Sequence, residues 1–433
     1  MNSLTSLYSP TLLNIDFDLL VDNATKNRIG PRQKPPSSYW RVPDKQQYLT
    51  SIAVHESQSL CAVSSGSRSN NLFIYELAPN SGVPTLTHHQ TISLPEIHSL
   101  CWVSPASDLG SHGNVLVSGH KGGLVHMTLL PDTHSSDVPA EILKRFNHSR
   151  HLPASAPSLR IKNLALTSAS WSTFPSSGII TQCGDHLFLW DPSRSDLPLI
   201  KQKLRGDITS MDLCTTRNGI MAFGGRKGVS IRDLRVKGGS GLSPPDPANE
   251  QATVVKWSPH NDNLVASVHN RKEIKVWDIR ASGPASSYSG HSDWVTAIEW
   301  ARNEPTEIIS ASNDGTIRVW DIVKPDRLCG TNHSVRQELD WAPSKNWKMY
   351  QMRQFNDLEL DTLARNLLSP SQPMISQNRH FTAMKLASRG AVSIDSEGYF
   401  GYHCLHNELY SPVLAPSESD TSDGDFLPPL SPT

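Results

Sequence analysis

Three residues in the segment 290–321 have side chains that could carry out nucleophilic catalysis together. His291, Ser310 and Asp314 supply an imidazole, a hydroxyl and a carboxylate, which are the groups of a Ser–His–Asp triad. The same groups, with the indole N–H of Trp320, can also satisfy one another inside a small sheet, where an unpaired polar group costs about 1–3 kcal/mol. The elements that carry these residues decide between the two interpretations.

The segment itself predicts three antiparallel strands. The stretches VTAIEW and TIRVW alternate in polarity, and the short apolar run EIIS lies between them. Alternation with a period of two is typical of half-buried strands, and the Asn-Asp-Gly sequence at 313–315 marks a tight turn. We therefore expect a three-stranded meander, with a fourth strand in the residues that follow.

One meander cannot cover both faces of its sheet, so the unit has to repeat. A shift of 43 residues towards the N-terminus places Trp320 on Trp277, Trp300 on Trp257 and Ser310 on Ser267 without a gap. Two adjacent units of this length are typical of a propeller.

The segment resembles a WD repeat, the unit of WD-type β-propellers. Its GH pair at 290–291, its SASNDG turn and its closing Trp-Asp at 320–321 fall at that family's spacing. In such repeats a His, a Ser or Thr, an Asp and a Trp form a buried hydrogen-bonded chain. The resemblance therefore implies that His291, Ser310, Asp314 and Trp320 are a structural tetrad, and that the chain is not an enzyme and needs no cofactor or metal.

We predict an all-β fold, a seven-bladed WD-repeat β-propeller over residues 38–412, with disordered termini at 1–37 and 413–433. Seven candidate third strands occur along the chain, at Tyr75, Met127, Trp190, Arg232, Trp277, Trp320 and near Tyr402. Seven is also the commonest number of blades in the family. The stretch SYWRV at 38–42 is expected to close the ring by adding to the last blade.

Two stretches do not follow the repeat. An insertion at about 331–378 is predicted to be partly helical, because apolar residues recur there at helical spacing, namely Phe355, Leu358, Leu363, Leu367 and Leu368. The polar stretch 131–158, with His134, His148 and His151, has no zinc-like spacing and is predicted to be a solvated loop.

Composition narrows the classes of partner. With 40 basic and 41 acidic residues and a net charge of −1, the chain has no field that would attract nucleic acid or an anionic membrane. The six cysteines form no CxxC pair and no window approaches 18 apolar residues. We therefore expect reduced thiols, no membrane insertion, and a cytoplasmic or nuclear protein.

Two sets of residues could bind partner proteins. Trp294 precedes the strand VTAIEW, where WD propellers present a face to partners, and a large aromatic residue there can anchor binding. The sequence Trp-Asp-Ile-Arg at 277–280 resembles the WDxR box of the substrate receptors of cullin-RING ubiquitin ligases. That resemblance implies an adaptor contact through Asp278 and Arg280, with Arg235 in a degraded second copy. A general protein-interaction scaffold and a ligase receptor thus stay open as functions.

Overall fold

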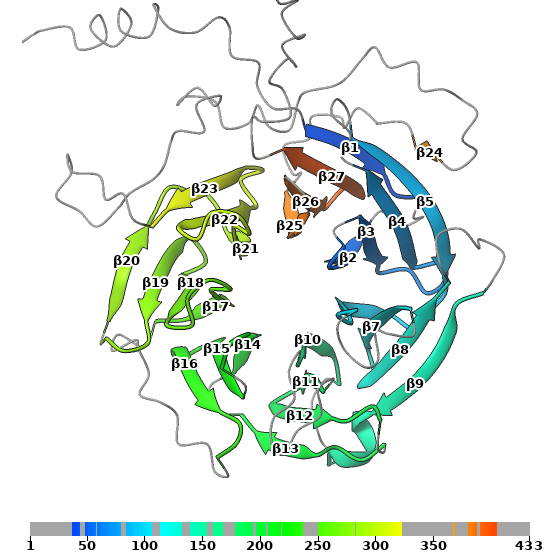
Figure 1. Ribbon diagram of the computed structural model, residues 1–433, viewed down its shortest axis with the longest axis horizontal. Helices are drawn as coiled ribbons and strands as arrows, with labels where there is room; N and C mark the ends of the chain where they lie inside the picture. Colours follow the sequence, from blue (N-terminus) through cyan, green and yellow to red (C-terminus); the bar gives the residue numbers. More distant parts are fainter. Residues whose placement is uncertain are drawn as a thin grey trace, which may run out of the picture.

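The computed structural model describes residues 37–43, 48–57, 59–78, 84–105, 113–131, 139–153, 159–167, 178–193, 196–204, 207–217, 219–236, 250–281, 283–322, 367–368, 380–387 and 390–404. These residues form seven antiparallel sheets arranged as blades around a central channel (Figure 1). The predicted all-β, seven-bladed propeller is confirmed. Among the residues described, no helix is long and apolar enough to cross a membrane.

The first three blades come from the N-terminal half of the chain. Blade one contains β2 (Leu49–Val54), β3 (Leu60–Ser65), β4 (Leu72–Ala78) and β5 (Thr85–Ile92). Blade two contains β6 (Ile97–Trp102), β7 (Asn114–His120), β8 (Leu124–Leu130) and β9 (Glu141–Asn147). Blade three contains β10 (Ile161–Leu166), β11 (Ile179–Cys183), β12 (His186–Trp190) and β13 (Ile200–Lys203).

The other four blades complete the ring. Blade four contains β14 (Ile208–Leu213), β15 (Ile220–Gly225) and β16 (Gly228–Asp233). Blade five contains β17 (Ala252–Trp257), β18 (Leu264–His269), β19 (Glu273–Asp278) and β20 (Pro284–Tyr288), and blade six contains β21 (Val295–Trp300), β22 (Glu307–Ser312) and β23 (Ile317–Asp321). Blade seven contains β25 (Phe381–Ala387), β26 (Gly390–Asp395), β27 (Tyr399–Cys404) and β1 (Ser37–Arg41). The fourth strand expected in blade six falls outside the described residues.

All seven innermost strands share one irregularity. Each has a β-bulge between its first and third residues, where it pairs with the second strand of its blade. A bulge bends a strand and increases its twist, so its recurrence gives the seven strands a common shape around the channel. The apolar cores lie between neighbouring blades, as where Phe73 and Tyr75 of blade one pack with Phe400 of blade seven.

The N-terminal strand closes the ring, as the sequence predicts. β1 pairs with β27 from Ser37 opposite His403 to Arg41 opposite Tyr399. Trp40 is 1% exposed, and Ser37 Oγ lies 3.0 Å from His403 Nδ1. First and last parts of the propeller therefore share one sheet, which leaves no unpaired edge on β27.

Two predictions about irregular stretches are wrong where the structure describes them. Leu367 and Leu368 form strand β24, which pairs with Thr87 and Leu86 at the outer edge of β5, and so are not helical. The unpaired backbone N–H and C=O groups at the edge of β5 can hydrogen-bond to another strand. The spacing of apolar residues within 331–378 gives no information on such a distant partner. The rest of the predicted helix lies outside the described residues. The stretch 131–158 also contains β9 and the short 3₁₀ helix η2 (His148–His151), and His148 is buried.

Candidate functional site

Blade six brings the four residues of the predicted tetrad together. Trp320 Nε1 donates to Ser310 Oγ at 2.7 Å, and Ser310 Oγ lies 2.7 Å from His291 Nε2. His291 Nδ1 lies 2.9 Å from Asp314 Oδ2. Because the serine hydroxyl has one proton to give, His291 accepts it on Nε2 and donates from Nδ1 to Asp314.

In this network the Asp314 carboxylate carries the charge and the His291 imidazole is neutral. Burial lowers the pKa of His291, against the opposing effect of Asp314. For Asp314, burial alone would raise the pKa, but hydrogen bonds from His291, Thr316 and the backbone of Ser292 hold it well below its usual range. The imidazole is therefore neutral and the carboxylate ionised at neutral pH.

The connectivity from Ser310 through His291 to Asp314 is that of a catalytic triad. Ser310 is nevertheless 0% exposed in the middle of β22, and its Oγ also receives the Trp320 indole N–H. For Ser310 to act as a nucleophile, a substrate carbonyl would have to reach its Oγ, and the burial of this oxygen leaves no room for that approach. The arrangement instead has a structural role, because it satisfies the hydrogen-bonding groups of Trp320, Ser310, His291 and Asp314 at once.

Similar chains occur in blades five and three, which the 43-residue comparison misses. In blade five Trp277 Nε1 donates to Ser267 Oγ at 2.6 Å, and His269 Nε2 lies 2.8 Å from the same oxygen. The histidine comes from two positions along β18, on the same face as Ser267, so a gapless shift finds Ala248 instead. The gapless shift alone would indicate that blade five lacks the histidine and aspartate of the tetrad, but the structure shows that it has a histidine partner for Ser267.

His148 plays the corresponding role in blade three. Its Nε2 lies 2.6 Å from Thr181 Oγ1, which accepts the Trp190 indole N–H at 3.0 Å. Its Nδ1 lies 2.8 Å from the carbonyl of Gly123. His148 precedes β10 by 13 residues whereas His291 precedes β21 by four, so the spacing of the repeat gave no signal for it.

The candidate anchor Trp294 lies on the face of the ring that carries the turns between the second and third strands, called here the turn face. Its side chain is 47% exposed, and the Arg271 guanidinium stacks 3.9 Å from the ring centroid. The Trp294 backbone is held as well, because its carbonyl accepts from Asn313 N at 2.8 Å and its N–H donates to Asp293 at 2.7 Å. Trp294 is thus both accessible and fixed.

Arg271 occupies the sequence position that corresponds to Asp314. Asn270 and Arg271 have φ values of 47° and 65°, which suits the tight turn of three residues, 270–272, between β18 and β19. The turn directs Arg271 onto the next blade, where its carbonyl accepts from Val295 N at 2.7 Å. The 43-residue shift places Arg271 where blade six has Asp314, so the sequence showed that blade five lacks the tetrad aspartate. It gave no sign of the contact between Arg271 and Trp294.

The residues of the two WDxR-like boxes lie at the opposite end of their blades. Arg280 is 67% exposed, and its Nε and a terminal nitrogen donate to Asp278 at 2.9 and 2.7 Å. Arg235 donates in the same way to Asp233, at 2.8 and 2.5 Å. Hydrogen bonds from Arg280 lower the pKa of Asp278 to about 2. Each arginine is therefore already paired within its own box.

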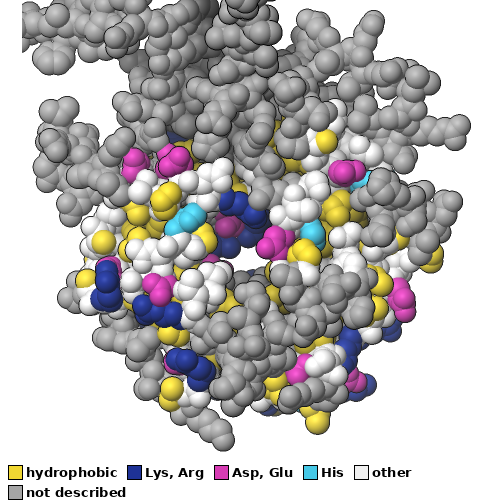
Figure 2. Space-filling model, viewed as in Figure 1, with side chains coloured by type: hydrophobic (Ala, Val, Ile, Leu, Met, Phe, Trp, Pro, Cys, Tyr) yellow, Lys and Arg dark blue, Asp and Glu magenta, His cyan; other side chains and the backbone are white. Residues whose placement is uncertain are grey.

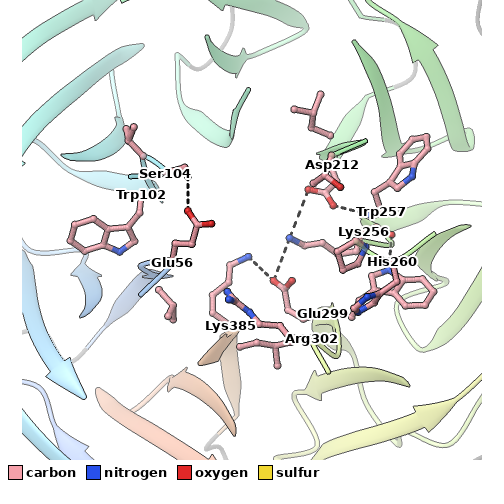
Figure 3. Close-up of a pocket in the computed structure, with 17 residues that line it drawn as sticks. Glu56, Trp102, Ser104, Asp212, Lys256, Trp257, His260, Glu299, Arg302 and Lys385 are labelled. Atoms are coloured by element: carbon pink, nitrogen blue, oxygen red, sulfur yellow. Dashed lines mark hydrogen bonds and ion pairs between the residues drawn. The ribbon is translucent and has the colours of Figure 1, made fainter. Parts of the chain in front are cut away.

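A cavity of about 570 Å³ lies at the end of the central channel away from the turn face. Figure 2 shows charged side chains around the central opening, and Figure 3 shows Glu56 and Ser104 on one side, Asp212 and Lys256 on the other, and Lys385 and Glu299 between them. Three acidic residues (Glu56, Asp212, Glu299) and three basic residues (Lys256, Arg302, Lys385) line it. Because acidic and basic side chains are equal in number, the lining of the cavity favours neither an anionic nor a cationic ligand.

Four of these residues form a ladder of alternating charge across blades four to seven. Lys256 Nζ lies 3.9 Å from Asp212 Oδ1 and 3.3 Å from Glu299 Oε1, and Lys385 reaches the same Glu299 oxygen at 2.5 Å. Burial would lower the pKa of Lys256, but Asp212 and Glu299 raise it. The two lysines likewise lower the pKa of Glu299 against the effect of burial.

This ladder was not predicted, although the sequence carries a signal for it. All four residues occupy the fifth position of an innermost strand, as in KW at 256–257 and EW at 299–300. The equivalent residues in blades one to three are Ala53, Cys101 and Ala165. At this strand position the residues are thus charged in blades four to seven and small and neutral in blades one to three.

Neither a metal site nor a disulfide is found in the part of the chain that the structure describes. No group of three or more His, Cys, Asp or Glu side chains there could hold a metal ion. Cys61, Cys101, Cys183 and Cys214 are free thiols.

Comparison with known proteins gives a family match. The family described as the DSE1 N-terminal domain matches residues 44–353. Protein DSE1 of Yarrowia lipolytica is 42% identical over 279 residues, covering 63% of this chain and 38% of that protein. Protein DSE1 of Debaryomyces hansenii is 32% identical over 291 residues, covering 64% and 43%. The chain thus spans about two fifths of the length of these curated relatives.

Solved structures share the fold at low sequence identity. The WD40 β-propeller domain of Doa1 superimposes with a TM-score of 0.56 at 12% identity, covering 88% of this chain and 100% of that one. Chaetomium thermophilum Raptor gives a TM-score of 0.54 at 12% identity, covering 85% of this chain and 30% of that one. These likenesses concern the propeller alone.

Proposed function

This chain belongs to the DSE1 family and folds as a seven-bladed propeller, and from that premise we propose that it is a non-enzymatic scaffold that binds other proteins on its turn face. The anchor of that interface is Trp294, supported by Arg271. Propellers commonly scaffold protein interactions, since a ring of paired strands is rigid and its turns offer separate contact surfaces.

The exposure of Trp294 carries the proposal. Among the tryptophans of the described residues, Trp40, Trp190, Trp277 and Trp320 are at most 1% exposed, and Trp102, Trp257 and Trp300 at most 7%, whereas Trp294 is 47% exposed. Tryptophan and arginine are the residues most enriched in interface hot spots. Because stacking and backbone hydrogen bonds already fix Trp294, a partner would lose little conformational entropy in using it.

Site-specific photo-crosslinking tests this proposal. A photoreactive phenylalanine analogue at position 294 should crosslink to a defined set of proteins in cells. The same analogue at Leu197, which is 65% exposed in the loop between β12 and β13, is the matched control. Identical patterns from the two positions would show that Trp294 belongs to ordinary surface.

The ligase-receptor function remains a second candidate, supported by the two boxes. Arg235 and Arg280 lie on adjacent blades and pair with Asp233 and Asp278 in the same geometry. This function would use the face opposite Trp294. Co-purification with a cullin-ligase adaptor, lost on Arg280→Ala and kept on Trp294→Ala, would establish it in place of the scaffold.

The scaffold as proposed needs neither cofactor nor metal, and it does not bind nucleic acid or insert into membranes. Four free thiols, three of them buried, suit a protein of a reducing compartment, the cytoplasm or the nucleus. Non-reducing electrophoresis of the protein from cells checks this, because a disulfide-linked form would contradict it.

A further inference from the structure

We propose that the turn face binds the chain's own acidic segment, residues 417–426, with Arg271 receiving a carboxylate while stacked on Trp294. The inference rests on the proposed function, because it assigns to the same surface an occupant that competes with partners. It also gives that surface a preference for acidic ligands.

The surroundings of Arg271 set it apart from the other exposed arginines of blades four and five. Arg217, Arg235 and Arg280 each donate to an aspartate at 2.5–2.7 Å, and Arg226 lies 3.9 Å from Asp207. Within the described residues, no carboxylate pairs with Arg271, whose guanidinium carbon lies over the Trp294 ring, 3.9 Å from its centroid. Stacking covers the face of a guanidinium and leaves its in-plane N–H donors free for a bidentate carboxylate.

Basic residues gather around this pair. The turns between the second and third strands of blades four and five carry Arg226, Lys227, Arg271 and Lys272, all of them exposed. Asp207 and Asp293 are the exposed acids beside them, and Asp207 lies 3.9 Å from Arg226. Lys275 lies there too and pairs with Glu250 and Glu273, which are only partly exposed, so five cations stand against four acids on this part of the turn face. The small excess of positive charge favours an acidic ligand.

The segment 417–426 has the complementary composition. It reads SESDTSDGDF, with four carboxylates, no basic residue and a terminal phenylalanine. Carboxylates suit Arg271 and the lysines, and an aromatic ring suits the open part of the Trp294 indole.

Chain length allows the contact. β27 starts at the turn face and ends at Cys404, at the other end of blade seven and next to blade six, so the chain has to return along the height of a blade. The dozen or so residues that lead from there to Glu418 can span roughly 40 Å when extended, at about 3.3 Å per residue. That reach is comparable to the width of a small domain, so the segment can occupy the surface of its own molecule.

A peptide-binding measurement tests the inference. The full chain is prepared with its segment neutralised by Glu418→Gln, Asp420→Asn, Asp423→Asn and Asp425→Asn. A fluorescein-labelled peptide of residues 415–430 is then titrated against it and followed by anisotropy. Saturable binding is expected, weakened at higher salt. The wild-type chain should bind the peptide more weakly, because its own segment competes.

Substitutions in the neutralised chain locate the site. Arg271→Ala and Trp294→Ala should each weaken peptide binding roughly tenfold or more, and Arg271→Lys should restore only part of it because an ammonium lacks the planar fork. Arg280→Ala removes an equal charge from an arginine that is already paired and should change binding less than twofold. Unchanged melting temperatures would show that the variants fold.

Two results would overturn the inference: no saturable binding to the neutralised chain, or equal losses from Arg271→Ala and Arg280→Ala. Either can be told apart from failure of the proposed function. If position 294 crosslinks a defined set of partners while the peptide does not bind, the scaffold stands and the acidic occupant falls. If the peptide binds but position 294 crosslinks only what Leu197 does, the scaffold falls.

Discussion

At the scale of single residues, the indole N–H groups of Trp277 and Trp320 make a testable contribution to stability. Each donates to a fully buried serine oxygen, Ser267 or Ser310. Trp277→Phe and Trp320→Phe remove the donor and reduce the ring, so each should lower the free energy of unfolding in urea by about 1–3 kcal/mol.

Trp294→Phe provides the control for this pair. Its indole is exposed, so the change should stay within about 0.5 kcal/mol. If Trp277→Phe matched this small change while Trp320→Phe did not, the network in blade five would contribute nothing.

Buried histidines make the fold sensitive to acid. Burial lowers the pKa of His148 and of His126 to about 4, and that of His120 to about 3, from ordinary values near 6.5. Each folded-state pKa lies below the unfolded one, so these groups cost nothing above pH 6.5 and destabilise progressively as the pH falls towards 4. At about 1.4 kcal/mol per pKa unit, each would remove roughly 3 kcal/mol by pH 4.

Urea unfolding at several pH values between 7.5 and 4.5 checks this. The free energy of unfolding should fall most steeply below pH 6.5, and His148→Gln should reduce the slope at some loss of stability at neutral pH. A flat profile down to pH 4.5 would contradict the pKa shifts.

At the scale of elements, β1 should decide whether the ring stays closed. Ser37 begins this strand and hydrogen-bonds to His403, so removal of residues 1–36 should leave the melting temperature nearly unchanged. Removal of residues 1–45 deletes β1, exposes the edge of β27 and should cause aggregation, as seen by size-exclusion chromatography. A soluble, cooperatively melting chain without residues 1–45 would show that another segment closes the ring.

Some elements could be predicted from the sequence because their pattern is local. Blades five and six share a gapless 43-residue spacing, and SYWRV at 38–42 reads as a strand with no partner nearby, so both the repeat and the closure were predictable. β24 was not, because its two residues form a strand only when the edge of β5 is beside them. Local periodicity cannot report a contact made 280 or so residues away.

The site divides in the same way. The His291 network follows from a spacing, whereas the Arg271–Trp294 stack joins neighbouring blades and depends on a left-handed turn. His148 was mistaken for a loop residue because its surroundings in sequence are polar. Only the fold shows that the side chain of His148 is buried between blades two and three, where it contacts Thr181 and Trp190.

At the scale of the whole molecule, the channel ladder should hold four blades together. Lys256→Met leaves Asp212 and Glu299 without their shared cation, although Lys385 still contacts Glu299. The side chains of Lys256, Asp212 and Glu299 are 17–27% exposed, so we expect a loss of about 1–3 kcal/mol rather than that of a dry ion pair. The measurement is urea unfolding.

A second substitution makes the prediction specific. Adding Glu299→Gln to Lys256→Met removes one of the stranded charges and should recover part of the loss. An additive further loss would mean that the ladder residues act independently of one another.

The two candidate interfaces lie on opposite faces of one rigid ring, so a single comparison separates them. Tagged wild-type, Trp294→Ala and Arg280→Ala chains are purified from cells in parallel, and their partners are quantified by mass spectrometry after equal folding has been checked by thermal melting. Binding through the turn face predicts that the wild-type partners are lost with Trp294→Ala and retained with Arg280→Ala. Retention of those partners by Trp294→Ala, with loss from Arg280→Ala, would contradict it.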